Sequence, residues 1–165
     1  PGPDVAPSRL DWDVLEGLGS RPRWVVETDR GRIVIELAAD QAPLTVQRLS
    51  GLAVAGRFDG VPFHRVVPTF VVQGGDLSRG PAGGAPAAPL SSEITRIPLE
   101  RGVIVMSKTG AQDTESIQIF ITHDRQPHLY WGYTAFGGGV DGMDVLDRIE
   151  LGDRIRAIHV VPDPR

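Results

Sequence analysis

Cysteine is absent from the 165 residues of this chain. That absence excludes disulfide bonds, thiolate catalysis and metal sites built on cysteine. Apolar runs of membrane-spanning length are also missing, so we expect no association with a membrane through such a segment. Charge of one sign is not concentrated anywhere: the formal net charge is −4, acidic and basic residues are interspersed, and there is no basic stripe. The sequence therefore disfavours nucleic acid as a partner.

The rest of the composition is that of an ordinary globular domain. Hydrophobic residues make up 41% of the chain and charged residues 23%, and 165 residues are enough for one domain with a core. The chain begins with Pro1 rather than methionine, so we expect it to be a domain of a longer protein. Residues 1–22 are assigned to an N-terminal arm or linker and residues 23–165 to the domain. Within the arm, the apolar residues from Leu10 to Leu18 also have loosely helical spacing.

The domain contains many short strand patterns and two helix patterns. A hairpin is predicted over residues 24–28 and 32–37, because the turn between them places Gly31 where a positive φ is wanted. Pro43 suits the first turn of a helix, and Gly56 suits its end. Other predicted elements are strands over 103–106, 118–121 and 156–161, a short helix over 143–149 and a surface loop over 79–92. With no strand–helix repeat, this order favours an antiparallel barrel or sandwich with added helices.

The most informative stretch is residues 63–76, FHRVVPTFVVQGGD, which is typical of two short strands around a turn at Pro68. A lone arginine, Arg65, stands among β-branched residues, although a guanidinium is rarely buried without a partner. Two adjacent glycines before Asp76 indicate a bend or a close approach that a side chain would block. Arg65 is either a functional cation or a structural ion-pair partner of Glu36, Asp76 or Glu93. The adjacent His64 is interpreted as a satisfied structural histidine.

This stretch resembles the signature of the cyclophilin-type peptidyl-prolyl isomerases, and the resemblance extends from Trp24 to Val161. It includes the blocks GRIVIEL (31–37), GVIVM (102–106), QIFIT (118–122), TAFG (134–137) and GMDVL (142–146). The resemblance implies a mainly β fold, a closed antiparallel barrel of about eight strands capped by two helices. Barrels of about this size are filled by side chains, so the site is expected on the outer surface. The implied activity is cis–trans isomerisation of X-Pro bonds in unfolded or flexible protein segments, as a folding helper without a cofactor.

The resemblance also assigns roles to residues. Arg65 would donate a hydrogen bond to the twisted peptide nitrogen, Phe70 would contact the proline ring, and Gln73 would hold the substrate backbone. The other expected substrate-binding residues are Val71, Ser107, Lys108, Gln118, Phe120, His128, Leu129 and Tyr133. Tyr133 stands where many relatives carry histidine, and His128 stands where cyclosporin-sensitive members carry tryptophan, which implies weak cyclosporin binding. A monomer is expected, and an exported or periplasmic setting is slightly favoured over the cytoplasm.

Two departures from the family pattern bear on activity. Glu115 and Ser116 replace two glycines, and Glu115 is expected to add a carboxylate beside the substrate. Tyr130 and Trp131 replace a smaller turn, so they either extend the site or fold over it. These departures leave an alternative function, a catalytically weak or inactive cyclophilin-like domain that binds peptides within a larger protein. His123 and His128 flank Asp124, but two histidines without further ligands make a poor zinc site, and they are interpreted as loop residues.

Overall fold

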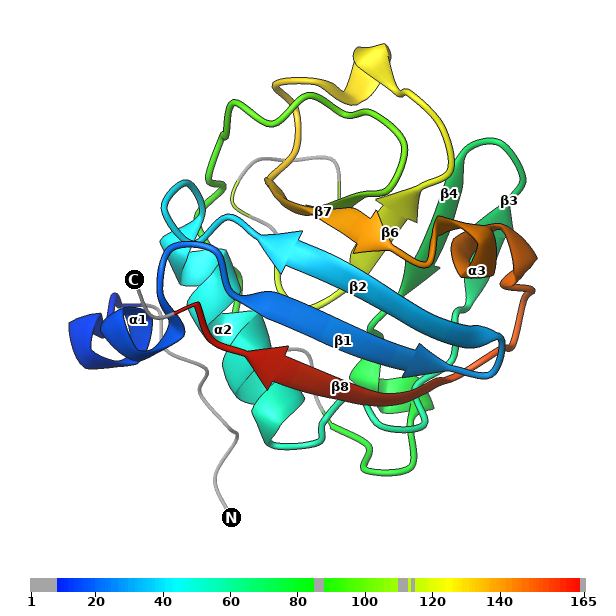
Figure 1. The fold of residues 1–165 in the computed structure, drawn as a ribbon, viewed down its shortest axis with the longest axis horizontal. Helices are drawn as coiled ribbons and strands as arrows, with labels where there is room; N and C mark the ends of the chain where they lie inside the picture. Colours follow the sequence, from blue (N-terminus) through cyan, green and yellow to red (C-terminus); the bar gives the residue numbers. More distant parts are fainter. Residues whose placement is uncertain (1–8, 85–87, 110–112, 114, 164–165) are drawn as a thin grey trace.

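A single antiparallel β-sheet dominates the computed structural model, which describes residues 9–84, 88–109, 113 and 115–163 (Figure 1). Eight strands follow one another in the order β3-β4-β6-β5-β7-β2-β1-β8. Their bounds are β1 Arg23–Thr28, β2 Gly31–Leu37, β3 Arg65–Val67, β4 Val71–Gly74, β5 Val103–Met106, β6 Ile119–Thr122, β7 Ala135–Asp141 and β8 Ile155–Val161. The helices are α1 Trp12–Leu18, α2 Pro43–Val54 and α3 Met143–Arg148, with 3₁₀ turns η1 Leu77–Arg79 and η2 Pro127–Leu129. None of the helices in these described residues is long and apolar enough to cross a membrane.

The sheet is curled but open, so the prediction of a closed barrel is wrong. β3 and β8 are the two end strands, and no ladder joins them in the described residues. The segments before them approach each other: Phe63 N donates to Asp153 O (2.8 Å) and Ile155 N to Val61 O (2.9 Å). Only one isolated bridge forms there, at Pro62. The pairing does not continue into a regular ladder, because Val61 N and Asp153 N donate within their own segments and not to the facing one.

The concave side of the sheet holds the main core. Along β6, Ile119 and Ile121 face this core, while Phe120 between them faces outward, as the two-residue period of a strand requires. Trp24 is completely buried, and its indole N–H donates to Ser50 Oγ at 3.1 Å. The ring centroids of Phe58 and Phe136 lie 6.1 and 6.2 Å from the ring centroid of Trp24. The filled interior leaves the outer face of the sheet for a site.

Helix α2 begins at Pro43, as predicted, but its N-terminus is capped from a distance. The N-cap residue Ala42 offers no side-chain acceptor. Instead, the Glu93 carboxylate accepts hydrogen bonds from Leu44 N (3.0 Å) and Thr45 N (2.9 Å). A carboxylate there satisfies free N–H groups and complements the helix dipole. Gly56 follows the helix with φ 69°, the left-handed conformation expected of it.

Residues 79–92 were predicted as a surface loop, and their described part is only partly on the surface. Residues 85–87 lie outside the described residues. Leu90 is 2% exposed and forms an isolated bridge with Glu115. Arg48, a buried residue of α2, donates to the carbonyl of Ala88. These contacts tie the end of the loop to the body of the domain.

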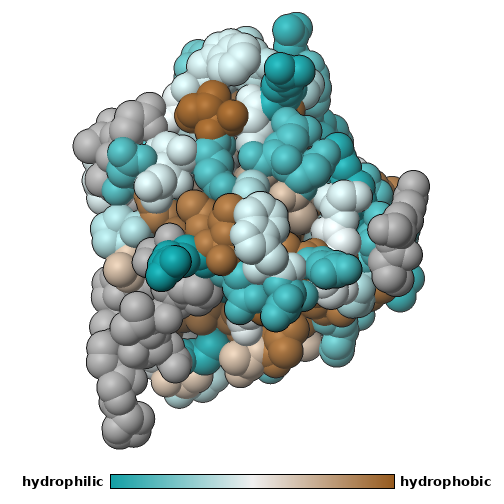
Figure 2. Space-filling view, turned by 90° about the vertical axis from the view of Figure 1, so that its left-hand side faces the viewer, coloured by the Kyte–Doolittle hydropathy of each residue, from teal (hydrophilic) through white to brown (hydrophobic). Residues whose placement is uncertain are grey.

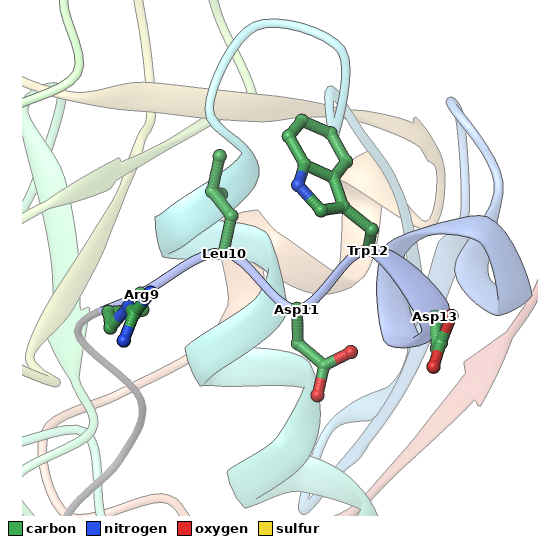
Figure 3. A pocket seen from close by; sticks show the side chains of 5 residues that line it. All are labelled: Arg9, Leu10, Asp11, Trp12 and Asp13. Atoms are coloured by element: carbon green, nitrogen blue, oxygen red, sulfur yellow. The ribbon is translucent and has the colours of Figure 1, made fainter.

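The segment before β1 forms helix α1, the helical alternative that the spacing left open. Asp11 caps it by accepting from Val14 N at 3.2 Å. The arm is tied to α2, because Asp11 N donates to Gln47 Oε1 (2.7 Å) and Gln47 Nε2 donates to Arg9 O (2.9 Å). In Figure 3, Leu10 and Trp12 point to the opposite side from Asp11, beside a hollow of about 440 Å³. Figure 2 views the molecule from the side of α1, where hydrophobic patches lie among hydrophilic atoms.

Candidate active site on the outer face of the sheet

A second apolar cluster, here called the outer cluster, lies on the face of the sheet opposite the main core. Its buried members are Val71, Leu99, Val103, Val105, Phe120 and Ala135, and its partly buried members are Phe70, Ile97, Leu129 and Tyr133. Phe120 and Tyr133 meet edge to face, with ring centroids 5.7 Å apart and planes at 81°. β4, β6, β5 and β7 are neighbours in that order, which brings residues distant in sequence together. The expected residues Phe70, Val71, Phe120, Leu129 and Tyr133 therefore share one cluster.

A row of polar side chains runs beside the outer cluster. Arg65 is directly opposite Gln73 in the β3–β4 pairing, and Gln73 is directly opposite Phe120 in the β4–β6 pairing. Arg65 Nη1 donates to Gln73 Oε1 at 3.4 Å. Gln73 Nε2 donates to Ser107 Oγ at 3.3 Å and to Gln118 Oε1 at 3.2 Å. The structure thus brings four of the expected polar residues into one hydrogen-bonded row.

Arg65 is exposed and carries no ion pair in the described residues, so the structural alternative is wrong. The three proposed partners are occupied elsewhere. Glu36 pairs with Arg23 at 3.3 Å and Asp76 with Arg79 at 3.0 Å, while Glu93 caps α2. The guanidinium carbon of Arg65 instead lies 5.7 Å from the centroid of the Phe70 ring. A cation held over an aromatic face keeps its N–H groups available to a further acceptor.

Two other expected residues contact the rings of the outer cluster. The ammonium nitrogen of Lys108 lies 4.7 Å from the centroid of the Tyr133 ring. His128 stacks on Phe70, with ring centroids 6.0 Å apart and planes at 23°. All eleven residues predicted for the site therefore belong to the outer cluster, to the polar row or to a ring contact with one of them.

The Glu115 carboxylate does not lie beside the substrate face as expected. Glu115 is 1% exposed, and its carboxylate oxygens accept from Ser92 Oγ at 2.7 and 2.9 Å. Thr134 Oγ1 donates to the same carboxylate at 3.2 Å. Hydroxyl donors on both sides stabilise a buried carboxylate, which explains why it turns inward.

Tyr130 and Trp131 form a pair of their own beside the outer cluster. Their ring centroids are 4.6 Å apart, and Trp131 is 60% exposed. Neither belongs to the outer cluster, although Leu129 just before them does. Trp131 also has φ 66°, a left-handed conformation that is strained for a bulky residue. Of the two alternatives for this turn, the exposed position of Trp131 disfavours a cover over the cluster.

Two histidines, His64 and His123, each have a buried ring nitrogen. Among the described residues the buried His64 Nδ1 atom has no hydrogen-bond partner, so the description of His64 as satisfied is wrong. Burial, with a smaller contribution from the positive charge of Arg79, lowers the pKa of His64 below its usual range. His123 Nε2 is likewise buried, with no hydrogen-bond partner in the described part of the chain. No group of three or more histidine or acidic side chains gathers as a metal site in the part of the chain that the structure describes.

Several residues of the site were not predicted from the sequence, among them Gln126 and Leu99. Gln126 is 7% exposed, its N–H donates to Leu99 O at 2.7 Å, and its side chain donates to Thr69 O at 3.3 Å. It thereby holds the turn before Phe70 against the loop that carries Leu99. Both residues come from irregular segments whose contacts have no local sequence signal. The only sequence signal for this contribution was the pair of hydrophobic residues Ile97 and Leu99 in a segment without a predicted helix or strand.

The fold and this face together define a class: a curled β-sheet protein whose outer surface carries an apolar cluster with aromatic rings, bordered by an exposed arginine and a row of polar side chains. A family model described as cyclophilin type peptidyl-prolyl cis-trans isomerase/CLD matches residues 23–163. The peptidyl-prolyl cis-trans isomerase of Synechococcus elongatus is 36% identical over 141 residues, covering 84% of this chain and 96% of that protein. Peptidyl-prolyl cis-trans isomerase B of Bacillus subtilis is 37% identical over 134 residues, covering 80% of this chain and 92% of that protein.

Solved structures agree in fold. A cyclophilin type peptidyl-prolyl cis-trans isomerase of Cryptosporidium parvum superimposes with a TM-score of 0.78 at 24% identity, covering 87% of this chain and 99% of that one. The same protein in the presence of the dipeptide Ala-Pro gives a TM-score of 0.75. At this identity the structures show the fold alone. From the family match and the two bacterial relatives, the chain belongs to the cyclophilin-type peptidyl-prolyl cis-trans isomerases, a family of enzymes.

Proposed function

We propose that this chain accelerates rotation about X-Pro peptide bonds in unfolded or flexible protein segments, and that it does so on the outer cluster. The observation that carries the proposal is Arg65, an exposed arginine with no ion pair to any described residue, placed over Phe70 at the border of the outer cluster. An apolar wall suits the proline ring, and the guanidinium beside it suits the peptide bond whose nitrogen belongs to that ring.

The reaction asks for little from the protein. The C–N bond of a peptide rotates over a barrier of about 18–20 kcal/mol, because the nitrogen lone pair is delocalised into the carbonyl. No covalent bond breaks, so neither a nucleophile nor a general base is required. The catalyst has to bind the twisted state more tightly than either planar state. In the twisted state the nitrogen becomes a hydrogen-bond acceptor.

Each part of the site would supply one contribution. Phe70, Phe120, Leu129 and the buried Val71 would hold the proline ring. Arg65 would donate to the twisted nitrogen, since a guanidinium is always charged and its donors are fixed in a plane. Gln73, itself oriented by Ser107 and Gln118, would hold the flanking backbone, which fixes one side of the rotating bond.

The test is a protease-free measurement of cis–trans exchange on an Ala-Pro-Phe peptide by NMR exchange spectroscopy. We expect the parent protein to accelerate exchange and Arg65→Ala to lose about 10²-fold or more of kcat/KM, the usual cost of removing one preorganised donor. Arg32→Ala is the matched control, because Arg32 is an exposed arginine at the start of β2. Peptide binding without acceleration by the parent, with the fold intact, would instead establish the peptide-binding alternative.

The proposal also includes the binding of cyclosporin, the oligomeric state and the location of the protein. His128 stacks on Phe70 where cyclosporin-sensitive relatives carry tryptophan, so we propose weak cyclosporin binding, measurable by calorimetric titration. By resemblance to the family we also propose that the domain acts as a monomer, which light scattering tests. An exported or periplasmic setting is proposed on the same resemblance, and fractionation of cells tests it.

A further inference from the structure

Two cationic side chains border the outer cluster from opposite sides. Phe120 on β6 has β4 on one side and β5 on the other. Arg65 lies on the β4 side of Phe120, because it is paired with Gln73 on β4, and Gln73 is paired with Phe120. Lys108 follows β5, and the ring beneath its ammonium group belongs to Tyr133, just before β7. The two cations therefore lie on different sides of the central aromatic residue.

Lys108 is held in place but is not neutralised. Its ammonium nitrogen rests on the Tyr133 ring at 4.7 Å, and the side chain is half-buried. Among the described residues no Asp or Glu pairs with it, whereas many exposed arginines of the chain have an acidic partner. Glu115, the one acidic residue expected at this face, points inward to Ser92 and Thr134. The neighbours Ser107, Gln118 and Gln73 are neutral.

The overall charge of the protein makes this local arrangement informative. The formal net charge is −4, so the long-range field of the molecule repels acidic peptides. A preference for an acidic substrate would therefore come from the local cations. Arg65 is committed by the proposed reaction to the rotating bond, which leaves Lys108 as the cation available to a substrate side chain.

We infer that Lys108 is a specificity-determining residue that selects X-Pro segments carrying a carboxylate side chain close to the proline. The inference rests on the proposed function, because it assigns a substrate class to the same site. Since Lys108 lies on one side of Phe120 only, the carboxylate is recognised at one position of the peptide and not on both sides of the proline. The contact is a charge-assisted hydrogen bond from the ammonium group to the carboxylate.

The experiment compares capped peptides in which Glu or Gln occupies, in turn, each of the two positions before proline and the position after it. The parent sequence is Ala-Ala-Pro-Phe, and kcat/KM is measured by NMR exchange at low ionic strength. We expect Glu to be preferred over Gln by about twofold to fivefold at one position, the range of an exposed ion pair. The preference should shrink in 1 M salt, where the screening length falls to about 3 Å.

Variants connect the preference to the residue. Lys108→Gln should reduce the Glu/Gln ratio at that position to about one, and Lys108→Glu should invert it and favour a Lys peptide. Arg32→Gln removes the same charge from a distant part of the surface and should leave the ratio unchanged. A ratio of one for the parent at all three positions overturns the inference, and so does a preference that survives Lys108→Gln. If no Gln peptide is accelerated at all, the proposed function fails instead.

Discussion

The guanidinium of Arg65 lies over the ring of Phe70, with the carbon of the cation 5.7 Å from the ring centroid. Arg65 is on β3, and Phe70 closes the turn that leads into β4, so a single short hairpin carries both. The contact with the ring keeps the arginine oriented at the border of the outer cluster. It also connects the two roles proposed for this hairpin, holding a proline ring and donating to its nitrogen.

A substitution that keeps the charge but changes the geometry separates these contributions. We expect Arg65→Lys to recover only a small part of the activity that Arg65→Ala loses, because an ammonium group lacks the planar donors of a guanidinium. The stability of both variants should stay within about 0.5 kcal/mol of the parent, since Arg65 is exposed. NMR exchange and urea unfolding provide the two measurements. Full activity of Arg65→Lys would show that charge alone is sufficient.

Adjacent glycines in β7 give a matched pair for stability. A Cβ at Gly137 would lie 2.5 Å from the carbonyl oxygen of Glu36, whereas nothing lies within 4 Å of one at Gly138. We expect Gly137→Ala to destabilise the protein by about 1–3 kcal/mol, because the facing backbone has to move. Gly138→Ala should be neutral or stabilising by up to about 1 kcal/mol, since alanine restricts the unfolded chain. Urea unfolding of both variants checks the difference, and equal effects would contradict it.

These glycines lie in a strand that could not be predicted from the sequence, whereas several other elements could. The hairpin 24–37, the strands of the signature and helix α2 were predicted because hydrophobic period and turn residues are local signals. β7 was not predicted as a strand, because its run of glycines has low strand propensity and is explained only by the close approach of β2. The cap of α2 was also unpredictable, since Glu93 lies 49 residues from Leu44. The site residues were predicted from the family resemblance, but the hydrogen-bonded row that joins four of them depends on the strand order.

The pKa of His64 predicts a dependence of stability on pH. Burial lowers that pKa in the folded protein, whereas the unfolded chain takes up its proton near pH 6.5. Below about pH 6.5 the unfolded state therefore binds more protons, and stability falls as the pH drops through the folded pKa. The carboxylates of Asp76, Asp147 and Asp153 have lowered pKa values and lose their contribution only below about pH 4.

Between pH 7.5 and 5, the titration of His64 is therefore expected to change the stability of the protein. We expect the free energy of unfolding, measured in urea, to decrease across this window in the parent and to decrease less in His64→Gln. His159→Gln is the control, because His159 is an exposed histidine on β8. It should retain the slope of the parent. Equal slopes in all three proteins would show that the buried Nδ1 of His64 does not govern this dependence.

The turn at Trp131 tests whether the aromatic pair obstructs the site. Trp131 has φ 66°, a conformation that costs a non-glycine residue about 1–2 kcal/mol. Trp131→Gly should therefore raise the free energy of unfolding by about 0.5–1 kcal/mol, whereas Trp131→Ala retains the strain and should not. Because Trp131 is 60% exposed and outside the outer cluster, both variants should keep the kcat/KM of the parent on an Ala-Pro-Phe peptide. A large gain in kcat/KM for both variants would mean that the ring covers the cluster in solution and would restore the obstruction that this turn suggested.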